Sequence, residues 1–423
     1  MIDLHLLRTT PDLVREGIAS KRLGDPDAVD RALAADTARR AAVTQAQELR
    51  QAQGEVSAQI GLLMKAGNRE GAAPLVEQSN ALKAQIKVLD AEIREAEATL
   101  HDALLAIPNP PHPSVPVGGA EANELAFTWG DMPVFDFEAL PHWDLAEKHG
   151  LIDFERGAKA TGAGFPFYVG LGARLQRGLI QLFLDLAAEA GYTEIQPPLL
   201  FNEASGIGTG QLPDKEGQMY EIERDGLYIV PTSEVVLVNY RRDEILDEAD
   251  LPLRYAAYTP CFRREAGSYG KDVRGLNRLH QFDKVEIVEF CCPEDSYERL
   301  EVMREIAERA VQTLGLPYRR LVLATGDMGM TQTKTYDLEV WSAGQERWLE
   351  VSSISNIEAY QARRANVRYR PDGGKPQFVH TLNASALALP RIVAALLEHG
   401  QNADGSVTLP SPLAERVGVQ QIG

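Results

Sequence analysis

Residues 75–100 read LVEQSNALKAQIKVLDAEIREAEATL, and apolar residues recur in this stretch at intervals of seven, four, three, four, three and four. They are Leu75, Leu82, Ile86, Leu89, Ile93, Ala96 and Leu100. This spacing is a heptad seam, so it predicts a long helix that packs lengthwise against a second helix. A looser seam precedes it, at Ala42, Ala46, Leu49, Val56, Ile60 and Leu63, with Gln53 on the same stripe. The sequence therefore predicts an antiparallel pair of helices over residues 31–104.

The turn between the two helices is predicted at residues 67–71. Pro74 follows, and because proline lacks the amide hydrogen that an interior helical position donates, we expect it to break the helix there. At ~1.5 Å per residue, two helices of about 30 residues make an arm about 45–50 Å long. Taken alone, such an arm is most often a dimerisation coiled coil, which is the alternative to any binding role. Residues 2–30 are predicted to form a small helical base, with Thr10 capping a helix that starts at Pro11.

A proline-rich stretch separates the arm from the rest of the chain. Residues 107–116 read IPNPPHPSVP, and five prolines in ten positions exclude a helix or an interior strand. The predicted organisation is a helical domain at 1–110, a linker at 111–118 and a mixed α/β body at 119–423. In that body, helices are predicted at 171–190 and 295–314, and strands at 227–230, 285–290 and 321–324.

The densest group of candidate functional side chains lies in residues 261–286. The chain reads CFRREAG at 261–267, passes through a polar loop and resumes as RLHQFDKVE at 278–286. If both ends are antiparallel strands, alternation places Arg263 and Glu265 on one face. On the partner strand, the same alternation places five side chains on one face. They are Arg278, His280, Phe282, Lys284 and Glu286. Arginine suits phosphate and a Phe ring stacks on a purine, so this hairpin is a candidate nucleotide site; the alternative is a solvated charged face.

Three further segments carry polar side chains in patterns that packing alone does not require. Residues 231–234 (PTSE) follow a predicted strand. Residues 350–356 (EVSSISN) are predicted to alternate, with Glu350, Ser352 and Ile354 on one side and Val351, Ser353 and Ser355 on the other. Residues 381–385 (TLNAS) lead into a predicted helix start at 386–391. Arg391 lies near the positive end of that helix, where anionic ligands are favoured.

These segments, in this order, resemble the bacterial-type seryl-tRNA synthetases, a family of class II aminoacyl-tRNA synthetases. Residues 191–198 (GYTEIQPP) resemble the class II motif 1, residues 262–286 motif 2 and residues 385–397 motif 3. The serine family is indicated by longer stretches, which are REAGS at 264–268, GKDVRGL at 270–276, TGDMG at 325–329, YDLEVW at 336–341, VSSISN at 351–356 and QARR at 361–364. The resemblance covers nearly the whole chain. It implies an α+β fold, in which a long antiparallel two-helix coiled-coil arm precedes a class II catalytic domain built on a mixed, mainly antiparallel sheet flanked by helices.

The resemblance also implies a two-step reaction. L-serine and ATP with Mg²⁺ give seryl-adenylate and pyrophosphate, and the seryl group then passes to the 3′ end of tRNA(Ser), with tRNA(Sec) as a further candidate. The implied catalytic residues are Arg263 at the α-phosphate, Glu265 at the adenine side, Arg278 at the terminal phosphates and Arg391, which sandwiches the adenine with Phe282. The ATP site that the resemblance implies comprises Arg263, Arg264, Glu265, Leu279, Phe282, Glu350, Val351, Ser352, Ser353 and Arg391.

The family's serine pocket matches six positions, which are Thr232, Ser233, Glu234, Glu286, Asn383 and Ser385. Which of the two carboxylates binds the serine hydroxyl stays open at this point. Glu350 and Ser353 match the family's metal ligands, and Mg²⁺ suits such oxygen donors. Archaeal-type seryl enzymes use zinc, but the three cysteines of this chain, Cys261, Cys291 and Cys292, lie outside the matched serine-binding positions, so no zinc is expected. In motif 3, Ala384, Ala386 and Pro390 stand where the family commonly has Gly, which puts the local geometry in question.

Charge and composition bear on the partners. The chain has 43 Lys and Arg against 61 Asp and Glu, a net charge of −18, which argues against indiscriminate binding to nucleic acid. Residues 1–110 contain 13 Lys and Arg against 16 Asp and Glu, a net charge of −3, so the acidity lies mainly in the catalytic body. Basic side chains along the arm are available to contact the phosphate backbone of an RNA. They are Arg39, Arg40, Arg50, Lys65, Arg69, Lys83, Lys87 and Arg94. We therefore expect tRNA(Ser) to bind through the arm, recognised by shape. The resemblance also implies a homodimer through motif 1.

The chain carries no signal-peptide pattern and no apolar run of ~18 residues, and three cysteines cannot build a disulfide framework. We therefore expect a cytoplasmic protein without a membrane partner. Two other functions are alternatives to a ligase that charges tRNA. A regulatory factor that has lost aminoacylation is expected to lack Arg263, Glu265, Glu286 or Arg391, and a ligase that loads a carrier other than tRNA is expected to lack the arm. All of these features are present in the sequence.

Overall fold

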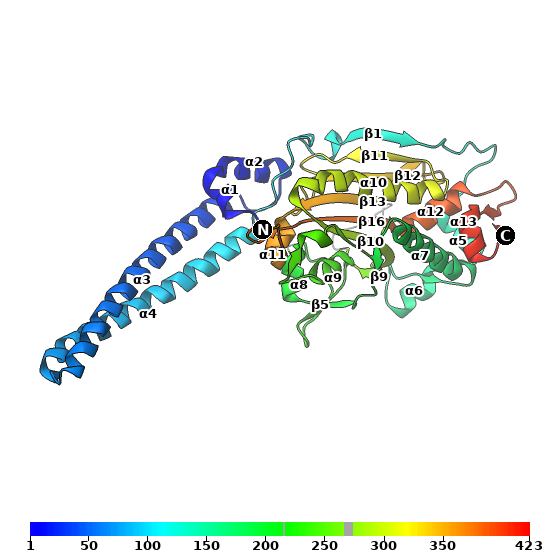
Figure 1. Ribbon diagram of the computed structural model, residues 1–423. Helices are drawn as coiled ribbons and strands as arrows, with labels where there is room; N and C mark the ends of the chain where they lie inside the picture. The colour runs from blue at the N-terminus through cyan, green and yellow to red at the C-terminus, as the bar shows by residue number, and fades with distance from the viewer. Residues whose placement is uncertain (215, 266–273) are drawn as a thin grey trace. The chain divides into compact units, whose positions relative to one another are not determined.

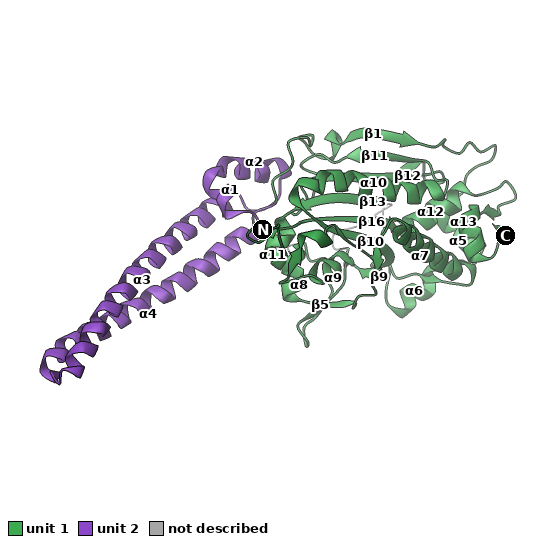
Figure 2. Cartoon of the chain, in the orientation of Figure 1, with its two compact units in different colours: residues 1, 109–423 green, residues 2–108 purple. Residues whose placement is uncertain are grey.

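The computed structural model describes residues 1–214, 216–265 and 274–423. It divides into two compact units (Figure 2). One unit is residues 2–108, and the other is residues 109–423 together with Met1. The Pro-rich stretch belongs to the second unit from Asn109 onward: the amides of Asn109 and His112 donate to the carbonyls of Met330 and Thr333 at 2.8 and 2.9 Å. Among the described residues, no helix has the length and apolar character needed to cross a lipid bilayer.

The first unit is built from helices (Figure 1). They are α1 (Leu4–Thr9), α2 (Pro11–Lys21), α3 (Ala28–Lys65) and α4 (Arg69–Leu105). The predicted antiparallel pair is confirmed by α3 and α4, and every residue of the two seams is buried or half-buried. An ion pair between Arg50 and Asp90, 2.5 Å from nitrogen to oxygen, links the two helices across the seam.

Pro74 does not break the second helix, contrary to the prediction. The helix begins at Arg69, five residues earlier, and the side chain of Asn68 caps it by accepting from the Gly71 amide at 2.9 Å. Pro74 lacks the amide that would donate to the Glu70 carbonyl, but Glu70 and Pro74 are both exposed, so water can bond to that carbonyl instead. The helices are therefore longer than predicted, with 38 and 37 residues. Thr10 precedes α2 as expected, but its hydroxyl donates to the Leu6 carbonyl and makes no side-chain cap bond.

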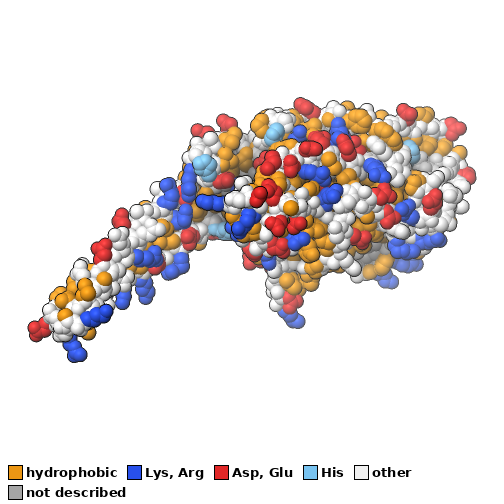
Figure 3. Space-filling model, in the orientation of Figure 1, with side chains coloured by type: hydrophobic (Ala, Val, Ile, Leu, Met, Phe, Trp, Pro, Cys, Tyr) orange, Lys and Arg blue, Asp and Glu red, His pale blue; other side chains and the backbone are white. Residues whose placement is uncertain are grey.

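A buried carboxylate at the base of the arm forms ion pairs with three arginines. Asp36 is 1% exposed and accepts from Arg8 at 2.7 Å, from Arg40 at 3.0 Å and from Arg39 at 3.3 Å. The hydrogen bond from Arg8, above all, lowers the pKa of Asp36 to about 2. Arg39, Arg40 and Arg50 are thus engaged with acidic partners inside the unit. Figure 3 shows Lys and Arg side chains spread further along α3 and α4.

The second unit is organised around a sheet whose described strands number eight, in the order β1-β11-β12-β13-β16-β10-β9-β4. Neighbouring strands are antiparallel except β4 and β9, which are parallel. The mixed, mainly antiparallel sheet is therefore confirmed. The strands are β1 (Glu124–Trp129), β4 (Thr193–Glu194), β9 (Leu253–Phe262), β10 (Gln281–Cys291), β11 (Tyr318–Val322), β12 (Lys334–Ser342), β13 (Arg347–Glu358) and β16 (His380–Ala388).

Helices and small sheets surround the large sheet. The helices are α5 (His142–Lys148), α6 (Phe154–Ala160), α7 (Leu171–Glu189), α8 (Glu203–Thr209), α9 (Glu234–Asn239), α10 (Ser296–Thr313), α11 (Tyr360–Ala365), α12 (Leu389–His399) and α13 (Ser411–Val417). The small strands are β2 (Ile152–Asp153), β3 (Phe167–Tyr168), β5 (Leu200–Asn202), β6 (Glu221–Ile222), β7 (Leu227–Ile229), β8 (Ile245–Asp247), β14 (Arg368–Arg370), β15 (Gln377–Phe378), β17 (Val407–Thr408) and β18 (Gln421–Ile422). The helices predicted at 171–190 and 295–314 correspond to α7 and α10. The strand predicted at 321–324 ends earlier, at Val322.

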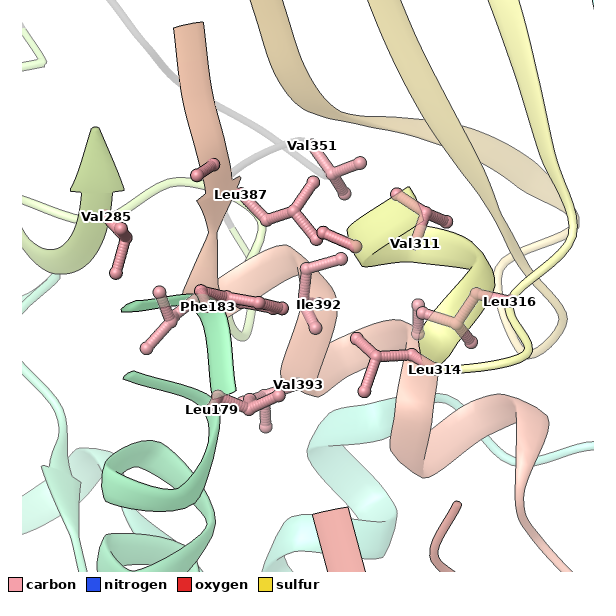
Figure 4. Packing of buried hydrophobic residues seen from close by; sticks show 14 of the residues in the cluster. Leu179, Phe183, Val285, Val311, Leu314, Leu316, Val351, Leu387, Ile392 and Val393 are labelled. Atoms are coloured by element: carbon pink, nitrogen blue, oxygen red, sulfur yellow. The ribbon is translucent and has the colours of Figure 1, made fainter. Parts of the chain in front are cut away.

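Alternation along β10 separates the core from the polar face of the sheet. Val285 and Ile287 join the main hydrophobic core, which α7, α10 and α12 complete. In that core Phe183 lies among side chains that include Leu179, Ile392 and Val393 (Figure 4). Lys284 and Glu286 point to the opposite face, where they are available for polar contacts, while Val288 and Phe290 farther along that face join a second hydrophobic cluster.

We predict that Phe183→Ala lowers the free energy of unfolding of the second unit by about 3–5 kcal/mol, because a ring that is 1% exposed leaves a cavity. Urea unfolding followed by tryptophan fluorescence measures this, since all four tryptophans, Trp129, Trp143, Trp341 and Trp348, lie in that unit. The control is Val134→Ala, at a side chain that is 95% exposed. A loss no larger than that of the control would contradict the placement of Phe183 in the core.

Candidate active site

The candidate site lies on the polar face of β10, where β9 and β16 flank it. The register pairs Glu286 with Ser385 of β16 and with Ala257 of β9. The segment 231–234 enters the same site between β7 and α9, and Thr232 contacts Glu286 directly. Segments far apart in the chain therefore converge on Glu286.

A buried network joins Thr232, Lys284 and Glu286, which are 3%, 6% and 3% exposed. The Lys284 ammonium donates to the Thr232 hydroxyl at 3.0 Å and forms an ion pair with the Glu286 carboxylate. The Thr232 hydroxyl in turn donates to Glu286 Oε2 at 3.4 Å. Because burying an unpaired charge is costly, the ion pair with Lys284 is the contact that stabilises Glu286 there.

A second carboxylate, Glu234, lies beside this network without a cation in hydrogen-bond contact among the described residues. It accepts from the amide of Gln361 at 2.6 Å and from Asn383. Burial, and the negative charge of Glu286, raise the pKa of Glu234. Gln361 is itself held by Thr381, whose hydroxyl donates to Gln361 Oε1 at 2.9 Å. The pocket therefore holds two carboxylates against one ammonium, an arrangement that favours a cationic ligand.

Arg263 borders this pocket and an aromatic surface at the same time. Its Nε approaches the carbonyl of Pro231 at 3.4 Å, and its guanidinium lies 5.3 Å from the centre of the Phe282 ring. Next to it, Glu265 forms an ion pair with Arg278. A forked cation, a ring face and a second cation thus line one side of the site, which suits a purine nucleotide.

Arg391 closes the site from the first turn of α12, as the sequence predicted. Its Nη1 donates to the backbone carbonyl of Glu350 at 2.6 Å and lies 3.6 Å from the Glu350 carboxylate. Its Nε donates to the carbonyl of Asn277 at 3.1 Å. The helix begins at Leu389 rather than at residue 386, because β16 continues to Ala388.

The predicted alternation over residues 350–355 is wrong, because a β-bulge interrupts it. Leu338 pairs with Ser352, whereas its neighbour Glu339 pairs with Glu350, so Val351 is the extra residue. Val351 and Ile354 consequently both join the main core. The bulge places Glu350 and Ser353 together on the opposite face.

Asp337 of β12 faces this pair. It lies directly opposite Ser353 in the strand register and is 9% exposed. Burial and the nearby Glu350 charge raise the pKa of Asp337, and its Oδ1 has no hydrogen-bond partner among the described residues. An unsatisfied carboxylate oxygen beside a second carboxylate and a hydroxyl is a donor set that a small oxygen-binding cation fits.

The strand alternation predicted for the hairpin holds only in part. β9 ends at Phe262 and β10 begins at Gln281, so Arg263, Glu265, Arg278 and His280 lie outside the strands. Glu265 has a φ of +48°, which alternation along a strand does not anticipate. Phe282, Lys284 and Glu286 are within β10 as predicted. Residues 266–273 of the expected motif 2 lie outside the described residues.

The remaining predicted site residues are placed as follows. Arg264 bonds through its amide to the Gln218 carbonyl at 2.9 Å, and the Leu279 and Val351 side chains are in the main core. The Ser352 hydroxyl donates to the Ser385 carbonyl at 2.6 Å, and the buried Ser233 hydroxyl has no partner among the described residues. In motif 3, neither Ala384 nor Ala386 has a positive φ, so their methyl groups are accommodated, whereas Leu387 does, at +83°.

Three residues of the site were not assigned a role from the sequence. Lys284 shares a strand face with Glu286, and that two-residue spacing was the signal that could have identified it. Gln361 of α11 and Asp337 of β12 lie in the family stretches QARR and YDLEVW, but those stretches assign neither residue a role. Only the fold brings these two to the site.

Comparison with known proteins is consistent with this geometry. The class II tRNA synthetase core domain model (G, H, P, S and T) matches residues 219–400, and the seryl-tRNA synthetase N-terminal domain model matches residues 1–111. The serine–tRNA ligase of Salinibacter ruber is 56% identical over all of this chain and 99% of the relative, and that of Geobacillus kaustophilus is 48% identical over the full length of both. The chain belongs to the serine–tRNA ligase family. The crystal structure of seryl-tRNA synthetase from Pyrococcus horikoshii complexed with ATP superposes with a TM-score of 0.94 at 35% identity, covering 100% of this chain and 99% of that one.

Membership of the serine–tRNA ligase family confirms the resemblance inferred from the motifs. The class II core match, residues 219–400, contains every candidate site residue from Thr232 to Arg391. The helical unit, residues 2–108, falls within the part that matches the family's N-terminal domain. Both units therefore have counterparts in serine–tRNA ligases.

We predict that Glu234→Gln stabilises the ligand-free protein, and increasingly so as the pH rises. The stability of a protein with a carboxyl group whose pKa is raised by folding is greatest below the unfolded pKa of that group, and it falls as the pH rises from there through the raised folded pKa. The free energy of unfolding should therefore be greater for the variant at pH 8 and equal to wild type near pH 4. Denaturant titrations at both pH values measure this, with Glu415→Gln at an exposed site as the control. A difference that is the same at both pH values would contradict a buried, destabilised carboxylate.

Proposed function

We propose that this protein is a serine–tRNA ligase, which activates L-serine with ATP to seryl-adenylate and pyrophosphate and transfers the seryl group to the 3′ end of tRNA(Ser). The observation that carries the proposal is the position of Arg263. Its Nε lies 3.4 Å from the carbonyl of Pro231, the neighbour of Thr232 in the chain, and its guanidinium lies 5.3 Å from the centre of the Phe282 ring. An amino acid in the pocket and a nucleotide on the ring would meet at this guanidinium.

The serine pocket is proposed to consist of Thr232, Ser233, Glu234, Glu286, Asn383 and Ser385. Its excess of negative charge supports binding of an ammonium group, and the two carboxylates together supply acceptors for the ammonium and hydroxyl hydrogens. The unpartnered hydroxyl of Ser233 adds a further group for a polar ligand. Alanine, which lacks the hydroxyl, would leave polar groups in this pocket unsatisfied, and this penalty supports selection of serine.

For ATP, the proposed residues are Arg263, Arg264, Glu265, Arg278, Leu279, Phe282, Glu350, Val351, Ser352, Ser353 and Arg391. The adenine would lie between Phe282 and Arg391, with the α-phosphate at Arg263. A serine carboxylate oxygen then attacks the α-phosphorus, and the bond from that phosphorus to the pyrophosphate oxygen breaks. Arg263 stabilises the charge that develops at phosphorus, and Arg278 binds the departing phosphates, so catalysis here is positioning and electrostatics. Leu279 and Val351 have core side chains, which leaves their backbone for any contact.

Mg²⁺ is proposed to bind at Glu350 and Ser353. Their shared face and the unsatisfied Asp337 oxygen support this, since Mg²⁺ is usually held by one or two carboxylates together with substrate phosphates. When bound, the ion would supply positive charge next to the phosphates of ATP. No zinc is proposed in the serine pocket.

The proposed partner of the arm is tRNA(Ser), with tRNA(Sec) as a second substrate, and the proposed assembly is a homodimer through residues 191–198 in the cytoplasm. A match of residues 1–111 to a seryl-tRNA synthetase N-terminal domain supports the arm's role. A regulatory protein without activity is disfavoured because Arg263, Glu265, Glu286 and Arg391 are all retained. A ligase for another carrier is disfavoured because the arm is complete.

The proposal predicts that serine drives exchange of labelled pyrophosphate into ATP. Alanine should be at least about 100-fold poorer in kcat/KM, because it leaves buried polar groups without the hydroxyl they pair with. Threonine, which keeps the hydroxyl, should also be poorer, because its extra methyl group must fit into a pocket sized for serine. Exchange assays with each amino acid measure this. No exchange with serine, or equal exchange with alanine, would overturn the assignment.

We further predict that replacing residues 31–104 by a short Gly/Ser link leaves serine-dependent exchange within about twofold of wild type. The same variant should charge tRNA(Ser) on the order of 100-fold more slowly, because the phosphate contacts of the arm are lost. Exchange and charging are measured on the same preparation, so exchange serves as the internal control for folding. Charging that survives the deletion would show that the arm does not hold the RNA.

A further inference from the structure

A histidine–glutamate pair is completely buried outside the substrate pocket. His142, at the start of α5, and Glu398, near the end of α12, are both 0% exposed. His142 Nδ1 lies 2.8 Å from Glu398 Oε1, and the backbone amide of His142 donates to the same oxygen at 2.9 Å. Burial alone would raise the pKa of Glu398, but the hydrogen bonds from His142 and Ser342 hold that pKa below its usual value. The carboxylate is therefore a fixed acceptor.

The other ring nitrogen of His142 reaches a different part of the chain. Its Nε2 accepts from the backbone amide of Leu276 at 2.9 Å. Since Glu398 accepts the Nδ1 proton, Nε2 keeps its lone pair and can accept. The amide of Leu276 is buried with its residue at 1% exposed, so its loss of a partner would be costly.

The approach of this segment to α5 is close enough to restrict its sequence. Gly275 has a φ of +66°, and a Cβ on it would lie 2.3 Å from His142 Nε2. Its neighbour Arg274 places its guanidinium 4.5 Å from the centre of a Trp143 ring. Residues 274–276 are thus anchored on the N-terminal end of α5.

The anchored segment leads directly to the nucleotide side of the site. The Asn277 carbonyl, one residue from the anchor, accepts from Arg391 Nε at 3.1 Å, and its side-chain amide donates to Gln345 at 2.8 Å. Arg278, the next residue, pairs with Glu265. Glu398 lies on the same helix as Arg391, so the His142–Glu398 pair holds both partners of the Asn277–Arg391 bond.

We infer that His142 is a positioning residue for ATP: by accepting from the Leu276 amide, it fixes the backbone that orients Arg391 and Arg278. The inference rests on the proposed placement of ATP at Arg263, Phe282 and Arg391. His142 itself does not touch the nucleotide. Serine binding, on the other side of Arg263, should not depend on it.

The test uses two substitutions that each keep one half of the imidazole. The Asn amide nitrogen can occupy the place of Nδ1, so His142→Asn keeps the bond to Glu398 and removes the acceptor for Leu276. The Gln amide oxygen can occupy the place of Nε2, so His142→Gln keeps that acceptor. In pyrophosphate exchange by the full-length protein, we expect His142→Asn to raise KM for ATP about tenfold with KM for serine within about twofold, and His142→Gln to restore KM for ATP to within about threefold of wild type.

The matched control is His149→Asn, at the C-cap of α5, where the ring contacts the Gly405 carbonyl at 2.7 Å and no site residue that the structure describes. It should leave KM for ATP unchanged. Gly275→Ala tests the same contact from the other side without removing the buried pair, and it should also raise KM for ATP selectively. If His142→Asn does not fold, the effect of Gly275→Ala on KM for ATP tests the positioning role.

The outcomes separate the inference from the proposed function. If Arg391→Gln leaves KM for ATP unchanged, the proposed nucleotide placement is wrong. If Arg391→Gln raises it but His142→Asn and Gly275→Ala do not, only the positioning role is wrong. Equal effects of the Asn and Gln variants, or a parallel rise in KM for serine, would likewise overturn it.

Discussion

The register of β10 between β9 and β16 is the constraint on which the candidate site depends. Ten backbone pairs hold β10 to β9, from Gln281–Phe262 to Phe290–Leu253. Because side chains alternate along a strand, this register sends Val285 and Ile287 into the core and Lys284 and Glu286 to the polar face. A slip of one residue would bury the ion pair in the hydrophobic core and expose the valine, so the core and the pocket stabilise one another.

The pocket on that face contains more negative than positive charge. Glu286 is paired with Lys284, while the hydrogen-bond donors to Glu234 among the described residues are neutral and its pKa is raised. Near the nucleotide side, Asp337 has one oxygen without a partner among the described residues. Both regions are stable enough to fold because the surrounding core is large, and each is better satisfied by a cation. The proposed ligands, an ammonium group and Mg²⁺, carry that charge.

How much the sequence could predict depended on whether a pattern was local. The heptad seams predicted the helix pair because burial along α3 and α4 repeats every three or four residues. The motifs of the second unit identified the family. Pro74 was misjudged because the position of the helix start, set by the Asn68 cap, decides what a proline costs. The alternation at 350–355 failed at the Val351 bulge, which depends on pairing with a strand that is distant in sequence. Gln361, Asp337 and the His142–Glu398 pair are brought to the site only by tertiary contacts.

The composition of the helical unit limits how it can recognise RNA. Residues 2–108 contain no Phe, Tyr or Trp, so the unit has none of the large ring faces on which unpaired bases usually stack. Three of its arginines, Arg39, Arg40 and Arg50, are engaged with Asp36 and Asp90. An RNA held by this unit would therefore be read mainly through the path of its sugar–phosphate backbone. Changes of base identity that preserve that path should be tolerated, and changes in the length or direction of an RNA helix should not.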